Sequence, residues 1–289
     1  MQQKRQQKKI ILDQFYTKKE IAQKTVLLTN QKFNLASFDF IVEPSAGCGS
    51  FLDLLPTDKT IGIDLDPANP LDTRIIKHDY LKIDTKRYLT GEKILVIGNP
   101  PFGNLSSLAV DFFNKSAEYA SVIAFIVPRT FRKPGLVKRL NENFHLVEEE
   151  ILPEESYFLR DGTSYKGVPT VFQIWEAREE KREHSVLSDT IPIDWEWVKT
   201  PDKATHAIRR VGGLAGKILK IKQNISRPPN YFIKSDNPNI IKNFEEVYDE
   251  FWKNESKALN PKWDTAGIPS LSQKEICHYY NKFFKEKDK

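Results

Sequence analysis

Short, nearly continuous apolar runs separated by turns constrain the fold of this chain more than any other feature. The runs occupy residues 38–42, 60–64, 73–76, 93–98 and 121–127. Runs of this kind are typical of parallel strands that are buried on both faces of a sheet. Between the last two runs, apolar residues of 105–120 recur at helical spacing. The alternation predicts a doubly wound α/β sheet.

Two later runs, 144–147 and 168–175, predict an antiparallel pair at the edge of this sheet, which would end near Glu176. Residues Ser50–Leu55 have a helix-like pattern. A further helical pattern covers 239–252.

Charge and composition suggest where the domains begin and end. Residues 1–12 form a basic N-terminal arm, and the charged stretch 178–184 is the most linker-like segment of the chain. We therefore expect the sheet domain at 13–177 and a small C-terminal substrate-recognition region at 185–289. This region is too short to require a large core of its own.

Composition excludes several classes of protein. The formal net charge of +5, from 44 Lys and Arg against 39 Asp and Glu, is compatible with a polyanionic partner. The two cysteines, Cys48 and Cys277, are far apart and lack clustered ligands, which argues against disulfides and metal. No long apolar run or signal-peptide pattern is present. We expect a soluble, cytoplasmic protein without a membrane partner, and the sequence is silent on its oligomeric state.

A glycine-containing turn follows the first apolar run. In Glu43-Pro44-Ser45-Ala46-Gly47-Cys48-Gly49-Ser50, the glycines at 47 and 49 allow a tight turn and close approach of a ligand. Ligands of doubly wound sheets bind outside the carboxyl ends of the strands, so the turn is a candidate nucleotide site. A Gly-x-Gly pattern by itself also occurs in many purely structural turns.

Two aspartates follow the next two runs. Asp64 closes the second run at the separation from the glycines at which a carboxylate reaches ribose hydroxyls. Asp66 is an alternative, but the adjacent Pro67 suggests that Asp66 caps a helix. Asp79 follows the third run and could accept a hydrogen bond from an exocyclic adenine amine. These elements would suit a nicotinamide or flavin nucleotide equally well.

The tetrapeptide Asn99-Pro100-Pro101-Phe102 directly follows the fourth run. Its two prolines fix φ and remove two backbone donors, leaving a stiff rim of carbonyl acceptors. A planar aromatic amine is a poor nucleophile because its lone pair is delocalised into the ring. The Asn99 side-chain oxygen and the Pro100 carbonyl can accept hydrogen bonds from its two N–H groups and favour the pyramidal form that attacks a sulfonium methyl. Phe102 offers a ring face for a base removed from its stack.

In this order, the glycine turn, Asp64, Asp79 and the tetrapeptide resemble the Rossmann-fold adenine-N6 methyltransferases with an Asn-Pro-Pro-Phe or Asn-Pro-Pro-Tyr motif. The resemblance runs from about Asp13 to Glu176 and includes Phe15-Tyr16-Thr17, which is similar to the family's N-terminal cofactor motif. It implies a seven-stranded Rossmann-like methyltransferase sheet and S-adenosylmethionine as cofactor.

The resemblance also implies roles for individual residues. Phe15 and Thr17 with the loop 43–49 would hold the methionine part, Asp64 the ribose and Asp79 the cofactor's adenine amine. The catalytic residues would be Asn99, Pro100, Pro101 and Phe102. The cofactor-binding residues would be Phe15, Tyr16, Thr17, Glu43, Pro44, Ser45, Ala46, Gly47, Gly49, Asp64, Leu65, Asp79, Tyr80 and Asn99.

The substrate is less constrained than the reaction. Glutamine methyltransferases acting on release factors share the Asn-Pro-Pro-Tyr motif, but Phe102 resembles the adenine branch more closely. Arg129, Arg132 and Lys133 are positioned for phosphates, and Tyr165, Phe158 or Tyr157 for stacking on the base. These features favour a nucleic acid over a release factor, but they do not separate DNA from RNA. We expect DNA narrowly, with structured RNA as the alternative. An inactive scaffold subunit would show lesions in the motifs, and a nicotinamide-dependent oxidoreductase would not explain the paired prolines.

The C-terminal region carries residues suited to nucleic-acid contact through stacking and phosphate binding. They are Trp195, Trp197, Arg209, Arg210, Lys217, Lys220, Lys222, Arg227 and Tyr231.

Overall fold

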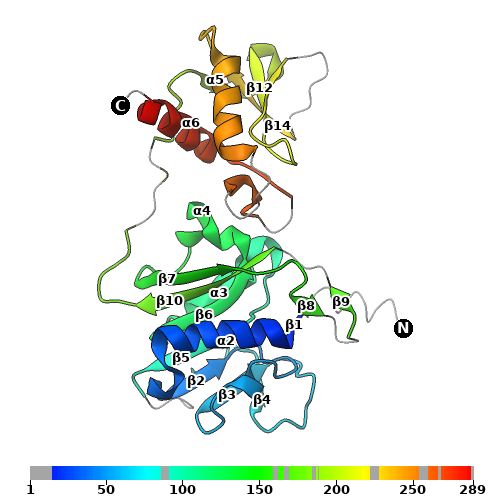
Figure 1. Ribbon diagram of the computed structural model, residues 1–289, viewed down its shortest axis with the longest axis vertical. Coiled ribbons are helices and arrows are strands. Elements are labelled where there is room, and N and C mark those ends of the chain that lie inside the picture. The colour runs from blue at the N-terminus through cyan, green and yellow to red at the C-terminus, as the bar shows by residue number, and fades with distance from the viewer. Residues whose placement is uncertain are drawn as a thin grey trace. The chain divides into compact units, whose positions relative to one another are not determined.

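The computed structural model divides the chain into two compact units, Met1–His184 and Ser185–Lys289, which are drawn in Figure 1. The residues that the structure describes are 15–85, 91–158, 162–165, 169–183, 187, 189–221, 228–253, 260–265 and 268–287. The predicted basic arm at 1–12 lies outside them. Each unit is described by itself below.

The first unit is built on a seven-stranded sheet with the order β4-β3-β2-β5-β6-β10-β7. Its strands are β2 (Phe40–Glu43), β3 (Thr60–Asp64), β4 (Ile75–Lys77), β5 (Ile94–Gly98), β6 (Val122–Pro128), β7 (Phe144–Ile151) and β10 (Thr170–Ala177). Neighbouring strands from β4 to β6 are parallel, whereas β10 is antiparallel to β6 and β7. Each predicted apolar run contributes a strand.

Helices cover both faces of this sheet (Figure 1). On one face, α2 (Lys19–Phe33) buries Ile21, Ala22 and Val26 in a cluster with the strand residues Ile41 and Leu95. On the other face, α3 (Ser107–Ser116) and α4 (Pro134–Val137) pack in a second cluster. The predicted doubly wound α/β fold is therefore confirmed.

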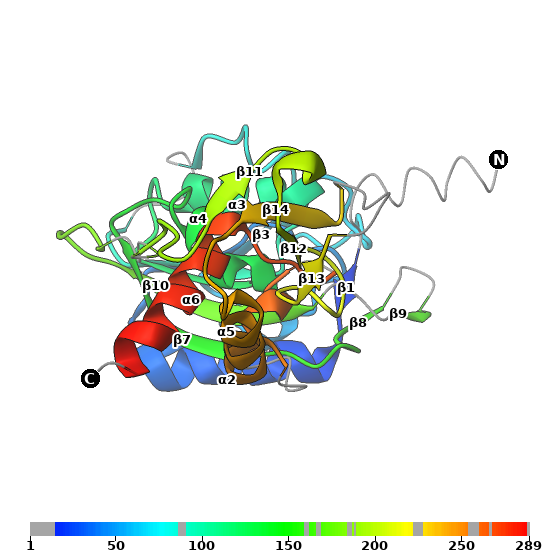
Figure 2. The ribbon, with the colours of Figure 1, turned by 90° about the horizontal axis from the view of Figure 1, so that it is seen from above.

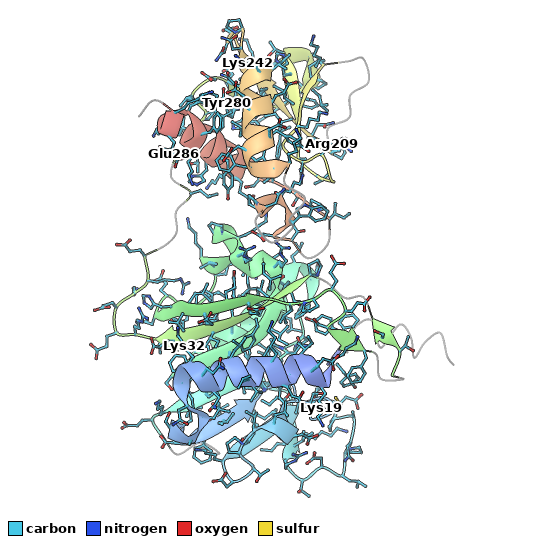
Figure 3. All side chains as sticks on the ribbon, viewed as in Figure 1. Lys19, Lys32, Arg209, Lys242, Tyr280 and Glu286 are labelled. Atoms are coloured by element: carbon cyan, nitrogen blue, oxygen red, sulfur yellow. The ribbon has the colours of Figure 1, made fainter. Side chains whose placement is uncertain are left out.

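The sequence pattern did not indicate α2, although Figure 3 shows Lys19 and Lys32 at opposite ends of a regular helix. Its buried face includes Thr25 and Thr29, whose hydroxyls donate to the carbonyls of Ile21 and Thr25 at 3.1 and 2.8 Å. These internal hydrogen bonds allow two polar residues to be buried. They also interrupt the apolar stripe by which such a helix is recognised.

Two local predictions were wrong. The segment Ser50–Leu55 contains only a short 3-10 helix, Leu52–Leu54, instead of a longer helix. Asp66 does not begin a helix, because turns and bends join β3 to β4. Its backbone N–H instead donates to the Asp64 carboxylate at 2.7 Å.

The structure has further short 3-10 helices at Leu35–Ser37, Asn104–Ser106, Arg129–Arg132, Pro201–Lys203 and Pro261–Trp263.

The predicted antiparallel pair at the sheet edge is present as β7 and β10. The strand β10 lies between β6 and β7, so that β7 forms the edge. Gln173, in the middle of β10, is buried with its amide hydrogen-bonded: the amide donates to Glu149 at 2.7 Å and accepts from the Trp175 indole at 3.1 Å.

A small separate sheet has the order β1-β8-β9. Its strands are β1 (Tyr16–Thr17), β8 (Tyr157–Phe158) and β9 (Ser164–Tyr165). The Tyr16 and Phe158 rings stack with centroids 5.6 Å apart. Strands of this length are too short to show periodicity, so the sequence gives no signal for them.

The second unit contains a four-stranded antiparallel sheet with the order β11-β14-β12-β13. Its strands are β11 (Glu196–Val198), β12 (His206–Arg209), β13 (Ile218–Lys220) and β14 (Asn230–Lys234). Its helices are α5 (Ile240–Val247), which continues as a π-helical turn over Tyr248–Trp252, and α6 (Gln273–Lys287).

This unit has a hydrophobic core of its own, which corrects the expectation that it is too short to require a large one. The helices α5 and α6 lie side by side in Figures 1 and 2, and the rings of Phe244 and Tyr280 are 4.9 Å apart. Trp195 and Trp252 are also buried in this core. Trp195 is therefore a packing residue, which corrects its prediction as a contact for nucleic acid.

Among the described helices, none combines the length and the apolar character that crossing a membrane requires.

Gly216 is required by the core of the second unit. Its φ is +96°, and an added Cβ would lie 2.3 Å from Cε3 of the buried Trp252. We expect Gly216→Ala to destabilise the protein by at least about 2 kcal/mol, because strain and overpacking combine. Gly213→Ala is the matched control, since an added Cβ at Gly213 meets nothing within 4 Å. Denaturant unfolding followed by tryptophan fluorescence checks this, and equal midpoints for the two variants would contradict it.

Candidate active site

A cavity of about 290 Å³ lies where β2, β3 and β5 end. This volume is near the lower end of the range for ligand pockets, roughly 300 to 1,000 Å³. Its lining residues are Phe15, Tyr16, Thr17, Glu43, Pro44, Ser45, Ala46, Gly47, Cys48, Ser50, Phe51, Asp64, Leu65, Asp66, Asp79, Tyr80, Leu81, Asn99, Pro101, Leu108 and Phe112.

Parallel pairing brings the predicted motifs to this edge of the sheet. Glu43 is level with Gly62 in β3, and Val42 is level with Val96 in β5. The glycine turn and the tetrapeptide therefore leave the sheet side by side, and the Ser45 hydroxyl donates to the Asn99 carbonyl at 2.9 Å. The chain adds β3 and β4 on one side of β2 and then β5 and β6 on the other. In a doubly wound sheet, such a reversal of strand order leaves a crevice at the carboxyl ends of the strands, where these motifs lie.

The glycine turn packs closely against the N-terminal strand. Gly47 has a φ of +53°, and an added Cβ would lie 3.0 Å from the Tyr16 ring. The hydroxyl of Ser50 donates to the Thr17 carbonyl at 3.0 Å. These contacts explain why glycine is needed at 47 and hold β1 beside the cavity.

The Asp64 carboxylate is held in place by the backbone. One oxygen accepts from the Gly47 N–H and the other from the Asp66 N–H, each at 2.7 Å. Each carboxylate oxygen can accept more than one hydrogen bond, so Asp64 retains acceptor capacity for ligand hydroxyls.

Asp79 and Tyr80 form another part of the wall. The Asp79 carboxylate accepts from the Leu81 N–H at 3.1 Å and pairs with the exposed Lys82 ammonium at 3.0 Å. Burial raises the pKa of Tyr80, whose hydroxyl bonds to Ser116 at 2.8 Å. Tyr80 is thereby fixed as a neutral phenol, and it sets the position of the adjacent Asp79.

Asn99 has a fixed orientation. Its side-chain Nδ2 donates to the Phe15 carbonyl at 3.2 Å, so its Oδ1 is the atom left for other partners. This Oδ1 is buried and accepts no hydrogen bond from any residue that the structure describes. An unsatisfied buried acceptor carries a desolvation cost of about 1 to 3 kcal/mol, which a donor from a ligand would remove.

Glu43 is a second buried group with an unsatisfied oxygen. Its side chain is 2% exposed, and Oε2 has no hydrogen-bond partner in the part of the chain that the structure describes. Burial raises the pKa of this carboxyl well above its ordinary value, although a hydrogen bond from the Leu52 backbone opposes the rise. The protein without ligand therefore favours the neutral form of Glu43.

Most residues predicted for the cofactor line this one cavity. Three of the predicted cofactor-binding and catalytic residues do not: Gly49, Pro100 and Phe102. Gly49 is buried with a φ of +82° and serves the turn itself. The ring of Phe102 is 7% exposed and belongs to the core cluster of α3, so it presents no stacking face in this conformation. The adjacent Pro101, and not Phe102, lines the cavity.

The residues predicted to contact the substrate are not gathered around the cavity. Arg129 is 3% exposed, which is too buried for a surface phosphate contact and corrects that prediction. Arg132 pairs with Glu149 at 3.0 Å, so its charge is already balanced. Lys133 is partly buried at the start of α4. The side chain of Tyr165 lies outside the described residues.

Several lining residues were missed from the sequence: Cys48, Ser50, Phe51, Asp66, Leu81, Leu108 and Phe112. Leu108 and Phe112 are four positions apart on α3, a spacing that places them on one face of a helix. That spacing was visible, but it equally indicates ordinary core packing. Among the described residues, no three His, Cys, Asp or Glu side chains are grouped as metal ligands would be.

No protein-family model and no curated protein matches the sequence. Among solved structures, a Pyrococcus horikoshii protein provisionally assigned as an RNA methyltransferase is similar, with 17% identity and a TM-score of 0.43 over 58% of this chain and 88% of that one. The magnesium protoporphyrin IX methyltransferase of Synechocystis, solved with bound S-adenosylmethionine, has 9% identity and a TM-score of 0.41 over 55% of this chain and 79% of that one. The 23S rRNA methyltransferase ErmE has 13% identity and a TM-score of 0.38 over 60% of this chain and 73% of that one. Likenesses this distant do not decide which reaction the chain carries out.

The raised pKa of Glu43 predicts how the stability of the protein depends on pH. A pKa that is raised in the folded state means that the folded protein binds the proton more tightly than the unfolded chain does. Its stability is therefore highest below the unfolded-state pKa and falls as the pH rises through the folded-state pKa. Glu43→Gln lacks this loss, so its melting temperature should exceed that of the wild type by a margin that widens as the pH rises above 4.5, the ordinary pKa of the group.

Thermal unfolding across this pH range measures the margin. The control is Glu92→Gln, which replaces an exposed carboxylate and should give no such margin. A margin for Glu43→Gln that stays constant with pH would show that the raised pKa is absent.

Proposed function

We propose that this chain is an S-adenosylmethionine-dependent methyltransferase that modifies the exocyclic N6 amine of adenine in a nucleic acid. The observation that carries the proposal is the orientation of Asn99. Its Nδ2 donates to the Phe15 carbonyl beside the cavity, and its buried Oδ1 accepts no hydrogen bond from the residues that the structure describes. A buried acceptor that is held in place and unsatisfied suits a substrate N–H group.

The cavity fits the proposed cofactor in its chemistry. S-adenosylmethionine supplies a methyl group on a positively charged sulfonium, together with an ammonium group, ribose hydroxyls and an adenine amine. The buried Glu43 carboxyl has an unsatisfied oxygen for the cationic methionine part. Asp64 offers acceptor positions for the ribose and Asp79 for the adenine amine, as the resemblance implies.

Asn99 and Pro100 act on the target amine. The Asn99 Oδ1 and the Pro100 carbonyl accept hydrogen bonds from the two N–H groups of the amine. These hydrogen bonds oppose delocalisation of the nitrogen lone pair into the ring and direct the lone pair toward the methyl carbon. The new nitrogen–carbon bond forms as the carbon–sulfur bond breaks, and the nitrogen then loses one proton to solvent. The protein has to position and polarise the amine, and it needs no strong base.

The alternatives fit the site less well. A nicotinamide-dependent oxidoreductase has no need of the unsatisfied Asn99 oxygen or the paired prolines. An inactive scaffold subunit is a poor match, because the glycine turn, both aspartates and Asn99 are intact and line one cavity. A glutamine side chain also presents a planar nitrogen, and Phe102 rather than tyrosine favours adenine. Stacking of that adenine on Phe102 would require the buried ring to become exposed.

We propose an unpaired adenine as the target, with DNA as the first polymer and structured RNA as the second. Either polymer must deliver the base out of its stack. Exposed Lys138 and Arg139, which follow α4, are better placed for phosphates than the buried Arg129.

Asn99→Ala tests the role of the tetrapeptide. Because Asn99 acts on the target amine, turnover should fall at least about 100-fold, as for other preorganised hydrogen-bonding groups. Cofactor affinity should change little, since the glycine turn and Asp64 remain. Labelled-methyl transfer measures the first quantity and calorimetry the second. Asn104→Ala, an exposed asparagine five positions later, is the control. Unchanged turnover in Asn99→Ala would refute the assigned role.

Asp64→Asn tests the cofactor assignment. Replacing a charged acceptor with an amide should weaken S-adenosylmethionine binding by about 1 to 3 kcal/mol, which is roughly 5- to 150-fold in Kd. Calorimetry with S-adenosylmethionine and, in parallel, with NAD checks this. A wild-type chain that binds NAD but not S-adenosylmethionine would overturn the proposed function, and an unaltered Kd in the variant would overturn the ribose contact.

A further inference from the structure

The second unit contains a cavity that the proposed reaction does not use. Its volume is about 550 Å³, within the range of roughly 300 to 1,000 Å³ that is usual for small-molecule sites. The residues that line it are Trp197, Val198, Lys199, Arg210, Pro228, Asn230, Tyr231, Phe232 and Gln273. They combine aromatic rings, two basic side chains and two amides, and all of them belong to the second unit.

Two aromatic rings form one part of its wall. In the pairing of β11 with β14, Trp197 lies opposite Ile233, which is two residues from Tyr231. Side chains two apart on a strand share a face, so the sheet brings Trp197 and Tyr231 together. Their centroids are 5.7 Å apart at an interplanar angle of 69°, and both side chains are partly exposed. Unlike the buried Trp195, they therefore retain surface for a ligand.

Arg210 places a cation beside these rings. Its guanidinium carbon lies 5.1 Å from the centre of the Tyr231 ring. The backbone on both sides is fixed, because the Arg210 N–H donates to the Pro229 carbonyl and its carbonyl accepts from Leu271, each at 2.9 Å. The Nε atom of Arg210 is buried and has no hydrogen-bond partner among the described residues of this unit. The exposed Lys199 adds a second positive charge to the lining.

This set of groups matches the parts of a nucleotide. Aromatic rings stack on the face of a base, and a guanidinium or ammonium pairs with phosphate. The amides of Asn230 and Gln273 line the same cavity and suit the polar edge of a base. A purely apolar ligand would leave the Arg210 and Lys199 charges without a purpose.

We propose that this cavity binds one unpaired nucleotide of the nucleic-acid strand, with the base against Trp197 and Tyr231 and the phosphate on Arg210 and Lys199. The biological partner rests on the proposed function, but the binding itself is measured without methyl transfer. The second unit would then hold the substrate strand while the first unit modifies an adenine.

The test measures binding of fluorescent oligothymidylate and oligouridylate to the full chain by anisotropy, in the absence of cofactor. These probes contain no adenine, so they report strand binding rather than binding of the target base. Tyr231→Leu and Arg210→Ala should each weaken binding roughly 5- to 100-fold, as expected for loss of base stacking or of a phosphate contact. Arg210→Lys, which keeps the charge, should lose less.

Three controls separate the possible results. Lys253→Ala removes an equal charge from an exposed position of the same unit outside the cavity, and it should bind as the wild type does. Asn104→Ala should also bind normally, since Asn104 is an exposed residue of the first unit that lines neither cavity. Unfolding midpoints identify any variant that fails to fold, and Arg210→Ala then provides the test if Tyr231→Leu is unstable.

Wild-type affinity in both Tyr231→Leu and Arg210→Ala would overturn the inference. Thymidine monophosphate that binds as tightly as the oligonucleotide would also overturn it, because the site would then serve a free nucleotide. If both variants lose strand binding and the wild type transfers no methyl group, this inference is supported and the proposed function is refuted. If both variants bind the strand normally and the wild type is an active methyltransferase, the proposed function is supported and this inference is refuted.

Discussion

Parallel pairing of β2 with β3 and β5 is the constraint on which the first unit's site depends. Parallel strands end at the same edge of a sheet, so the turn after Glu43, the carboxylate of Asp64 and the tetrapeptide beginning at Asn99 converge, although they are far apart in the chain. Backbone hydrogen bonds then fix each group, as Gly47 and Asp66 do for Asp64. The sheet supplies precision that no single loop could.

The convergence has an energetic cost that the proposed ligands would relieve. Glu43 is buried with one unsatisfied oxygen, and Asn99 is held with its own oxygen unsatisfied. Desolvated acceptors of this kind lower the stability of the ligand-free protein and strengthen its interaction with a cation or an N–H donor. Both unsatisfied groups line the same cavity, which links the cost in folding to the proposed reaction.

The sequence predicted the strands and the converging motifs because buried parallel strands and glycine turns have strong local patterns. It missed α2, whose buried threonines satisfy their own hydroxyls. It placed Arg129 and Phe102 at the surface, although both are buried, because the burial of a side chain after a strand depends on distant packing. The core around Trp252 and the meeting of Trp197 with Tyr231 depend on strand pairing between distant segments, which no local pattern encodes.

The most direct test of the central claim is the identity of the methylated product. The chain is incubated with labelled S-adenosylmethionine and, in parallel, with duplex DNA, single-stranded DNA, structured RNA and a release factor, and each product is digested and separated. The account predicts label on N6-methyladenine from at least one nucleic acid. Label on glutamine of the release factor alone, or on a nucleoside other than adenine, would contradict it.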